Sequence, residues 1–167
     1  MALVTNTLAS ALENMTPTAT EQPAIVAFSN AWSTYFAGAS ASGAPAIPGS
    51  FDLGITAMQA AMVGFSAPNA GAIGIQNGIS AFWTAITPLA SSIWVVPAVV
   101  LATVTPPTTL GTISAGLLTA FTTNTASNVS LHDAAMAIAM SLQGTGGLGG
   151  FAVGESASGA PVTLPIL

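Results

Sequence analysis

The stretch Phe82-Trp83-Thr84-Ala85-Ile86-Thr87-Pro88, with the segment Ile93-Trp94-Val95-Val96-Pro97 shortly after it, decides how this chain folds. Both lie inside a run without formal charge that extends from Leu53 to Leu131. Soluble domains keep about a quarter of their residues charged, whereas only 3% of this chain is charged. We therefore expect the outside of this region to be covered by something other than water.

A central helix is predicted here, because Ile75, Ile79, Phe82 and Ile86 are spaced along one helical face. Pro88 ends or kinks this helix, since proline lacks the N–H that the next turn needs. The same segment contains a GxxxG pattern. Because the whole chain is rich in small residues, we interpret the pattern as tight packing between helices, or as a chance match, and not as a membrane dimerisation motif.

Apolar spacing and capping signals predict five further helices. The best-marked one begins at Ser130, whose hydroxyl can accept the backbone N–H of Asp133. Residues 122–128 are predicted to form a polar linker. The five helices are expected over residues 2–14, 21–39, 51–65, 110–121 and 131–143. The predicted fold class is therefore mainly α, a small bundle of about five to six short helices.

Two parts of the chain are predicted to be irregular or extended. Around residues 91–104 the β-branched residues favour a strand, and Pro97 indicates an edge strand or an irregular segment because it removes a ladder donor. Residues 144–150 form a glycine-rich linker, and the residues after them form an apolar arm stiffened by prolines. We therefore divide the chain into one helical domain, residues 1–143, and a linker with an extended C-terminal arm, residues 144–167.

The composition argues against several classes of function, because lysine, arginine and cysteine are missing. Proteins bind phosphate backbones mostly through Lys and Arg, so we expect no nucleic-acid partner. Without cysteine there is no thiolate chemistry. The acids are scattered and show neither the spacing of metal ligands nor a catalytic carboxylate pair; they are Glu13, Glu21, Asp52, Asp133 and Glu155. We predict a protein that is not an enzyme, with no catalytic residues, no cofactor and no metal.

Two motifs that could signal catalysis have simpler interpretations. The sequence Gly144-Thr145-Gly146-Gly147-Leu148-Gly149 matches GxGxxG, but a helix precedes it, and neither a following helix nor a suitable acid is predicted, so we interpret it as a flexible linker. His132 and Asp133 are neighbours on a helix and point about 100° apart, so Asp133 cannot easily orient the imidazole. Both are better interpreted as residues of a helix start.

Large apolar residues that serve no expected active site are candidates for contacts with other proteins. They come from the central stretch, from the segment after it and from the C-terminal arm. The predicted interface residues are Phe82, Trp83, Ile86, Ile93, Trp94, Val95, Val96, Val99, Val162, Leu164, Ile166 and Leu167.

Three features occur together in this chain: a composition rich in Ala, Gly and Thr, short capped helices, and the sequence Ser130-Leu131-His132-Asp133-Ala134-Ala135 ahead of a glycine-rich arm. In these features the chain resembles small virion proteins of tailed phages and contractile injection particles. The resemblance implies a structural subunit of a tail, baseplate or capsid. Its partners would be other subunits, including copies of itself, and the particle would assemble in the host cytoplasm. Residues 1–6 carry no positive charge, so no Sec signal peptide is expected.

Two other classes of function remain as alternatives. A membrane-inserting protein is the second hypothesis, because residues 80–104 form an uncharged run long enough to cross a bilayer. We rank the membrane hypothesis below the structural subunit, because the run contains Pro88 and Pro97 and the chain has no Lys or Arg to anchor the ends of a membrane span. A secreted or surface-layer binding module is the third hypothesis.

Overall fold

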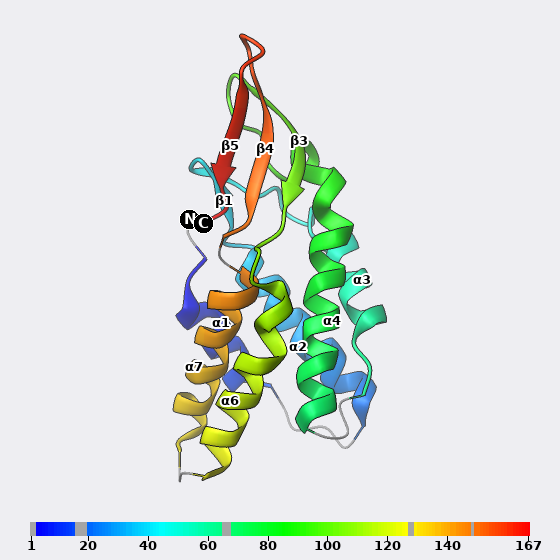
Figure 1. The fold of residues 1–167 in the computed structure, drawn as a ribbon, viewed down its shortest axis with the longest axis vertical. Helices are drawn as coiled ribbons and strands as arrows, with labels where there is room; N and C mark the ends of the chain where they lie inside the picture. Colours follow the sequence, from blue (N-terminus) through cyan, green and yellow to red (C-terminus); the bar gives the residue numbers. More distant parts are fainter. Residues whose placement is uncertain (1–2, 16–19, 65–67, 127–128, 148) are drawn as a thin grey trace.

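The computed structural model describes residues 3–15, 20–64, 68–126, 129–147 and 149–167 (Figure 1). Its longer helices are α1 (Thr5–Glu13), α2 (Glu21–Phe36), α3 (Asp52–Ala61), α4 (Pro68–Ile86), α6 (Ile113–Ala126) and α7 (Leu131–Leu142). Shorter helical segments are η1 (Thr87–Leu89), α5 (Ala90–Ile93), η2 (Leu110–Thr112) and a π-helical turn, η3 (Gln143–Gly147). The strands are β1 (Ser40–Ala41), β2 (Ala44–Pro45), β3 (Val99–Thr105), β4 (Phe151–Ser156) and β5 (Pro161–Pro165). The predicted fold class, mainly helical with an extended segment and arm, is confirmed.

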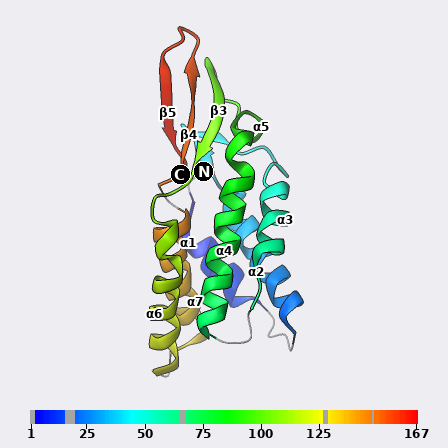
Figure 2. The ribbon, with the colours of Figure 1, turned by 45° about the vertical axis from the view of Figure 1, so that its right-hand side comes forward.

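The longer helices pack in a closed ring in which each one has two main neighbours. Along this ring, α1 packs on α2, α2 on α3, α3 on α4, α4 on α6, α6 on α7, and α7 on α1. The helices form one end of an elongated molecule, and the three-stranded sheet projects from the other end (Figures 1 and 2). Each helix therefore turns its apolar face toward the inside of one bundle.

An aromatic cluster lies where α2 and α4 meet. The ring centroid of Phe82 on α4 is 4.8 Å from Phe36 and 6.1 Å from Trp32, both on α2. Phe51, just before α3, is 5.9 Å from Phe82, and Trp83 is 5.5 Å from Phe36. All five side chains are buried, in the tilted and edge-on arrangements that aromatic rings prefer. The central stretch of the sequence is thus the centre of the core.

Glycines let α3 and α4 approach closely. A Cβ added at Gly78, the second glycine of the GxxxG pattern, would collide with Met62. A Cβ added at Gly54 on α3 would lie 2.7 Å from Cδ2 of Phe82. Neither glycine has room for a side chain, and at Gly78 this confirms the interpretation of the pattern as tight packing between helices.

The prediction of a polar linker over residues 122–128 is wrong for its described part, because α6 continues to Ala126. The threonine hydroxyls of this segment bond back to the helix: Thr122 Oγ1 donates to the carbonyl of Leu118 at 2.8 Å, and Thr123 Oγ1 to that of Thr119 at 2.9 Å. These bonds satisfy the polar side chains inside the helix. Polar composition alone therefore did not mark the end of this helix.

The sheet has the strand order β3-β4-β5, with both pairs antiparallel. β3 is an edge strand, as Pro97 indicated, and a register shift between Leu101 and Thr103 interrupts its pairing. Residues 151–165 are extended, as predicted, and form a hairpin whose first strand pairs with β3. The apolar arm therefore has strand partners within the chain.

The glycine-rich segment is a packed turn in its described part, which corrects the prediction of a flexible linker. Gly146 and Gly147 are buried in the π-helical turn that continues α7. Trp83 Nε1 donates a hydrogen bond of 2.7 Å to the carbonyl of Gly146, and a Cβ at Gly147 would lie 2.6 Å from Tyr35 Oη. The glycines are needed here because the backbone passes directly against two aromatic side chains.

Candidate functional site

The predicted interface residues of the central stretch lie in the core. Phe82, Trp83, Ile86, Ile93 and Trp94 are at most 1% exposed. A partner cannot reach them in this conformation, so the structure assigns them to the chain's own interior and corrects their place at an interface. Helical periodicity marks a face that is buried, but it does not tell whether that face is buried by the same chain or by another.

The other predicted interface residues lie at or near the surface around the sheet, with one exception. Val95 is 70% exposed and Leu167 is 48% exposed. Val96, Val99, Val162 and Leu164 are half-buried, whereas Ile166 is buried. The structure thus brings these residues to the sheet and the segments beside it, where Val96, Val99 and Leu164 still pack against the core.

One face of the three-stranded sheet is exposed and carries a single charge. The register places Val100 opposite Glu155, and Phe151 opposite both Thr105 and Pro165. Val100 is 74% exposed and Phe151 is 38% exposed. Such large apolar side chains on a surface strand are a feature of contact surfaces.

Many exposed threonines on the helices present little polarity to solvent. Their hydroxyls donate to the backbone carbonyl four residues earlier, at 2.8–3.0 Å. Examples are Thr34 to Asn30 and Thr84 to Ser80. Because the hydroxyl hydrogen is used inside the helix, these side chains offer a methyl group and an acceptor oxygen to the outside. The helix surface is therefore less polar than its threonine content suggests.

His132 joins the start of α7 to the end of α1. Its Nδ1 lies 2.9 Å from Oε2 of Glu13. The hydrogen bond to the Glu13 carboxylate, and secondly the charge of that carboxylate, raise the pKa of His132. The predicted cap is confirmed, since Ser130 Oγ accepts the backbone N–H of Asp133 at 3.1 Å. Sequence reasoning missed the ion pair, because its partners are 119 residues apart and no local pattern connects them.

The remaining acids are separated from one another. Glu21 accepts the backbone N–H of Gly64 at 2.6 Å, and Asp52 lies in the first turn of α3, where a negative charge is favourable. Glu155 is exposed on β4. Across the described ranges, no three His, Cys, Asp or Glu residues come together in a way that could hold a metal ion.

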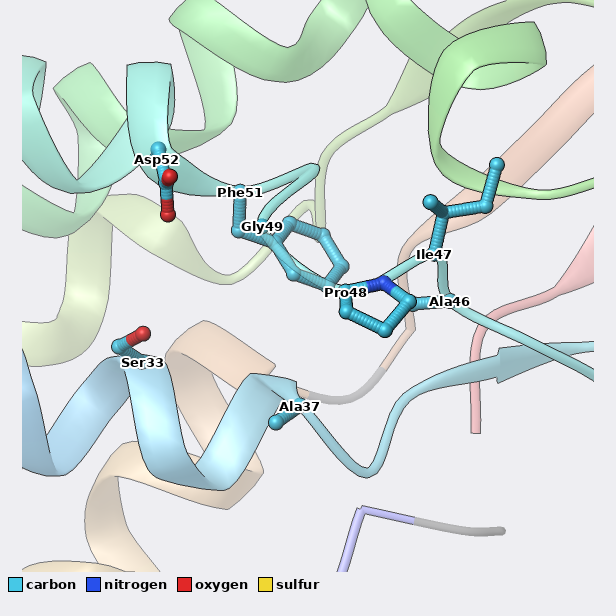
Figure 3. A pocket seen from close by; sticks show the side chains of 8 residues that line it. All are labelled: Ser33, Ala37, Ala46, Ile47, Pro48, Gly49, Phe51 and Asp52. Carbon is cyan, nitrogen blue, oxygen red and sulfur yellow. The ribbon is translucent and has the colours of Figure 1, made fainter.

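A small pocket lies between α2 and the segment before α3 (Figure 3). Ser33 and Asp52 line it from α2 and α3, together with Pro48 and the ring of Phe51. Its volume is about 140 Å³, well below the ~300–1,000 Å³ of small-molecule sites. It has room for a few water molecules and not for a substrate of ordinary size.

A larger opening, here named the basal groove, is lined by residues on or beside α1, α2, α4, α6 and α7. Its volume is about 250 Å³. It is lined by Leu12, Met15, Phe28, Ile75, Phe121, Leu131, Ala134, Ala135 and Ile138. Sequence reasoning missed it, because its lining residues come from segments far apart in the chain.

Comparison with protein-family models, with curated proteins and with solved structures gives no match. Among the described residues, the helices are too short or too polar for any of them to cross a bilayer.

Proposed function

We propose that this protein is a non-enzymatic structural subunit of a large protein assembly, held in place by neutral, apolar contacts. The observation that carries the proposal is the near absence of charge from its surface. The chain contains no Lys or Arg and only five acids. One acid is paired with His132, another binds a backbone N–H, and two lie in the first turns of helices.

Apolar side chains remain outside even though the chain folds compactly. Its accessible surface is 7903 Å², close to the ~7,500 Å² expected for a folded monomer of this mass. The exposed apolar residues include Val4, Leu53, Val63, Ile73, Val95, Val100, Leu131 and Met140. A partner is therefore not needed to complete the core, and these residues are available for contacts between subunits.

The kind of assembly follows from the resemblance to small virion proteins. We propose a phage virion or a phage-tail-like particle, with this chain in the tail, in the baseplate or associated with the capsid. Other subunits are the partners, and the particle assembles in the host cytoplasm. Both sheet edges limit growth by strand addition: β3 carries a register shift, and Pro161 and Pro165 on β5 offer no N–H. Side-chain faces are therefore the surfaces by which subunits meet.

Fractionation of native cells tests this function. The cells are lysed without detergent, the lysate is separated by sedimentation, and the chain is followed by an antibody. We expect the chain in soluble particles of megadalton size, and negative-stain microscopy with immunogold should place it on a tail, baseplate or capsid.

Two results would overturn the proposal. One is recovery of the chain only as a dispersed monomer at micromolar concentration, and the other is recovery only from membranes after detergent treatment. A cytoplasmic marker protein of similar mass serves as the control for incomplete lysis.

A further inference from the structure

The small pocket between α2 and the segment before α3 has one polar end and apolar walls (Figure 3). At the polar end, the hydroxyl of Ser33 on α2 and the carboxylate of Asp52 on α3 are directed toward each other. The other side chains of the lining are apolar; they are Ala37, Ala46, Ile47, Pro48 and Phe51. The pocket can therefore hold a group that is apolar along its length and polar at its tip.

The carboxylate at the polar end is free to meet a cation. Among the described residues, the side chain of Asp52 has neither a cation nor a hydrogen-bond donor as a partner. Gly49 keeps it accessible, since a Cβ at this position would lie 3.5 Å from Asp52 Oδ2. Asp52 lies in the first turn of α3, where the helix dipole contributes about half a positive charge. The full negative charge of the carboxylate exceeds this contribution, so the polar end favours a cation.

The apolar walls indicate which kind of cation fits. A Ca²⁺ ion takes about six to eight oxygen ligands and Mg²⁺ about six, whereas apolar side chains form most of this lining. A lysine side chain lays an apolar four-carbon stem along such a surface and ends in a compact ammonium group, while arginine carries a broader planar head. The volume of about 140 Å³ suits one side chain of this shape, since whole small molecules occupy ~300–1,000 Å³.

A second copy of these 167 residues cannot supply the lysine, because they contain neither Lys nor Arg. Their one imidazole, that of His132, already lies 2.9 Å from Glu13. We propose that this pocket receives a lysine side chain from a different subunit of the assembly, with its ammonium group between Asp52 and Ser33. The inference rests on the proposed function, since it names a contact within the same assembly.

Binding of lysine analogues to the purified full chain tests the pocket directly. The probes are N-acetyl-lysine N-methylamide and its Nε-acetylated form, which has the same stem without the charge. The NMR methyl signals of Ala37, Ala46 and Ile47 report occupancy. We expect saturable shifts with the charged probe and about two- to fivefold weaker binding of the uncharged one, the usual effect of one exposed ion pair. Equal affinity of the two probes, or the same shifts with ammonium chloride at equal concentration, would overturn the proposal.

Three variants identify the groups that bind. Asp52→Asn should lower the affinity for the charged probe to that for the uncharged one. Glu155→Gln is the matched control, because it removes the same charge from an exposed position on β4, and it should leave binding unchanged. Ala37→Leu enlarges an exposed residue of the lining and should block both probes without disturbing the core. Equal weakening by the two charge variants would show a general attraction of cations and would refute the site.

Cross-linking of the native particle separates this inference from the proposed function. A carbodiimide joins a carboxylate to an amine that touches it, and these 167 residues contain no lysine. A lysine joined to Asp52 must therefore lie outside them, and we expect such a conjugate in the mass spectrum. A particle that contains the chain but shows lysine conjugates only at other acids, such as Glu155, would refute the pocket contact and leave the structural role intact. The absence of any particle would refute the structural role, and the probe titrations would still decide whether the pocket binds lysine.

Discussion

Replacing Phe82 by alanine distinguishes a core role from an interface role for the central helix. The ring of Phe82 is fully buried in the chain and packs against those of Trp32, Phe36 and Phe51. Removing a buried phenylalanine costs about 3–5 kcal/mol, from lost transfer energy and from the cavity left behind. For a chain of this length we expect the melting temperature to fall by roughly 6–20 °C.

Urea unfolding, followed by tryptophan fluorescence, measures this loss. With a slope of about 2 kcal/mol per molar urea, the midpoint should fall by about 1.5–2.5 M. The matched control is Ile73→Ala on the same helix, where the side chain is 51% exposed and the expected change is within about 0.5 kcal/mol. If Phe82→Ala changed the free chain no more than this control, the side chain would not be part of the core and the packing described for α2 and α4 would be incorrect.

Three further changes test other parts of the structure. Gly154→Ala places a Cβ against the backbone of β3 and should lower the free energy of unfolding by about 1–3 kcal/mol; a variant as stable as wild type would contradict this strand pairing. Ser130→Ala removes the cap of α7 and should cost about 1 kcal/mol in urea unfolding, so an unchanged midpoint would exclude the cap. His132→Gln tests the ion pair: because Glu13 raises the pKa of His132 in the folded state, the stabilisation is complete below about pH 6.5 and is lost as the pH rises through the folded pKa. The wild-type advantage in urea midpoint should therefore be smaller at about pH 9 than at about pH 6, and a constant difference would contradict the pairing.

Local signals predicted much of the fold. The spacing of Ile75, Ile79, Phe82 and Ile86 predicted a central helix, and Pro88 its change of path, because side chains on one helical face recur every three or four residues whatever packs against them. The cap at Ser130 was equally predictable, since its hydrogen bond spans only three residues. Residues 91–104 were correctly expected to be extended over the part that forms β3.

Features that depend on distant partners could not be predicted. Nothing near residues 143–147 shows that this glycine-rich turn packs against Trp83 and Tyr35. The pairing of the C-terminal arm with β3 also depends on segments about 50 residues apart. The basal groove is the space left between residues of five separate segments. The sequence of any one helix does not indicate that this space exists.

The charge, the missing cations, the helical faces and the caps can all be read from the sequence, because each depends on residue identity or on neighbours within one or two turns. What those faces are buried against depends on how the elements pack together. Trp83 and Trp94, large and apolar enough for an interface, lie in the core, while Leu131 and Val100 lie outside it. The hydrophobic effect favours removal of apolar surface from water and has no preferred direction. The same apolar residues can therefore be buried by their own chain or by a partner. Which of the two occurs depends on how the helices and strands are arranged in space.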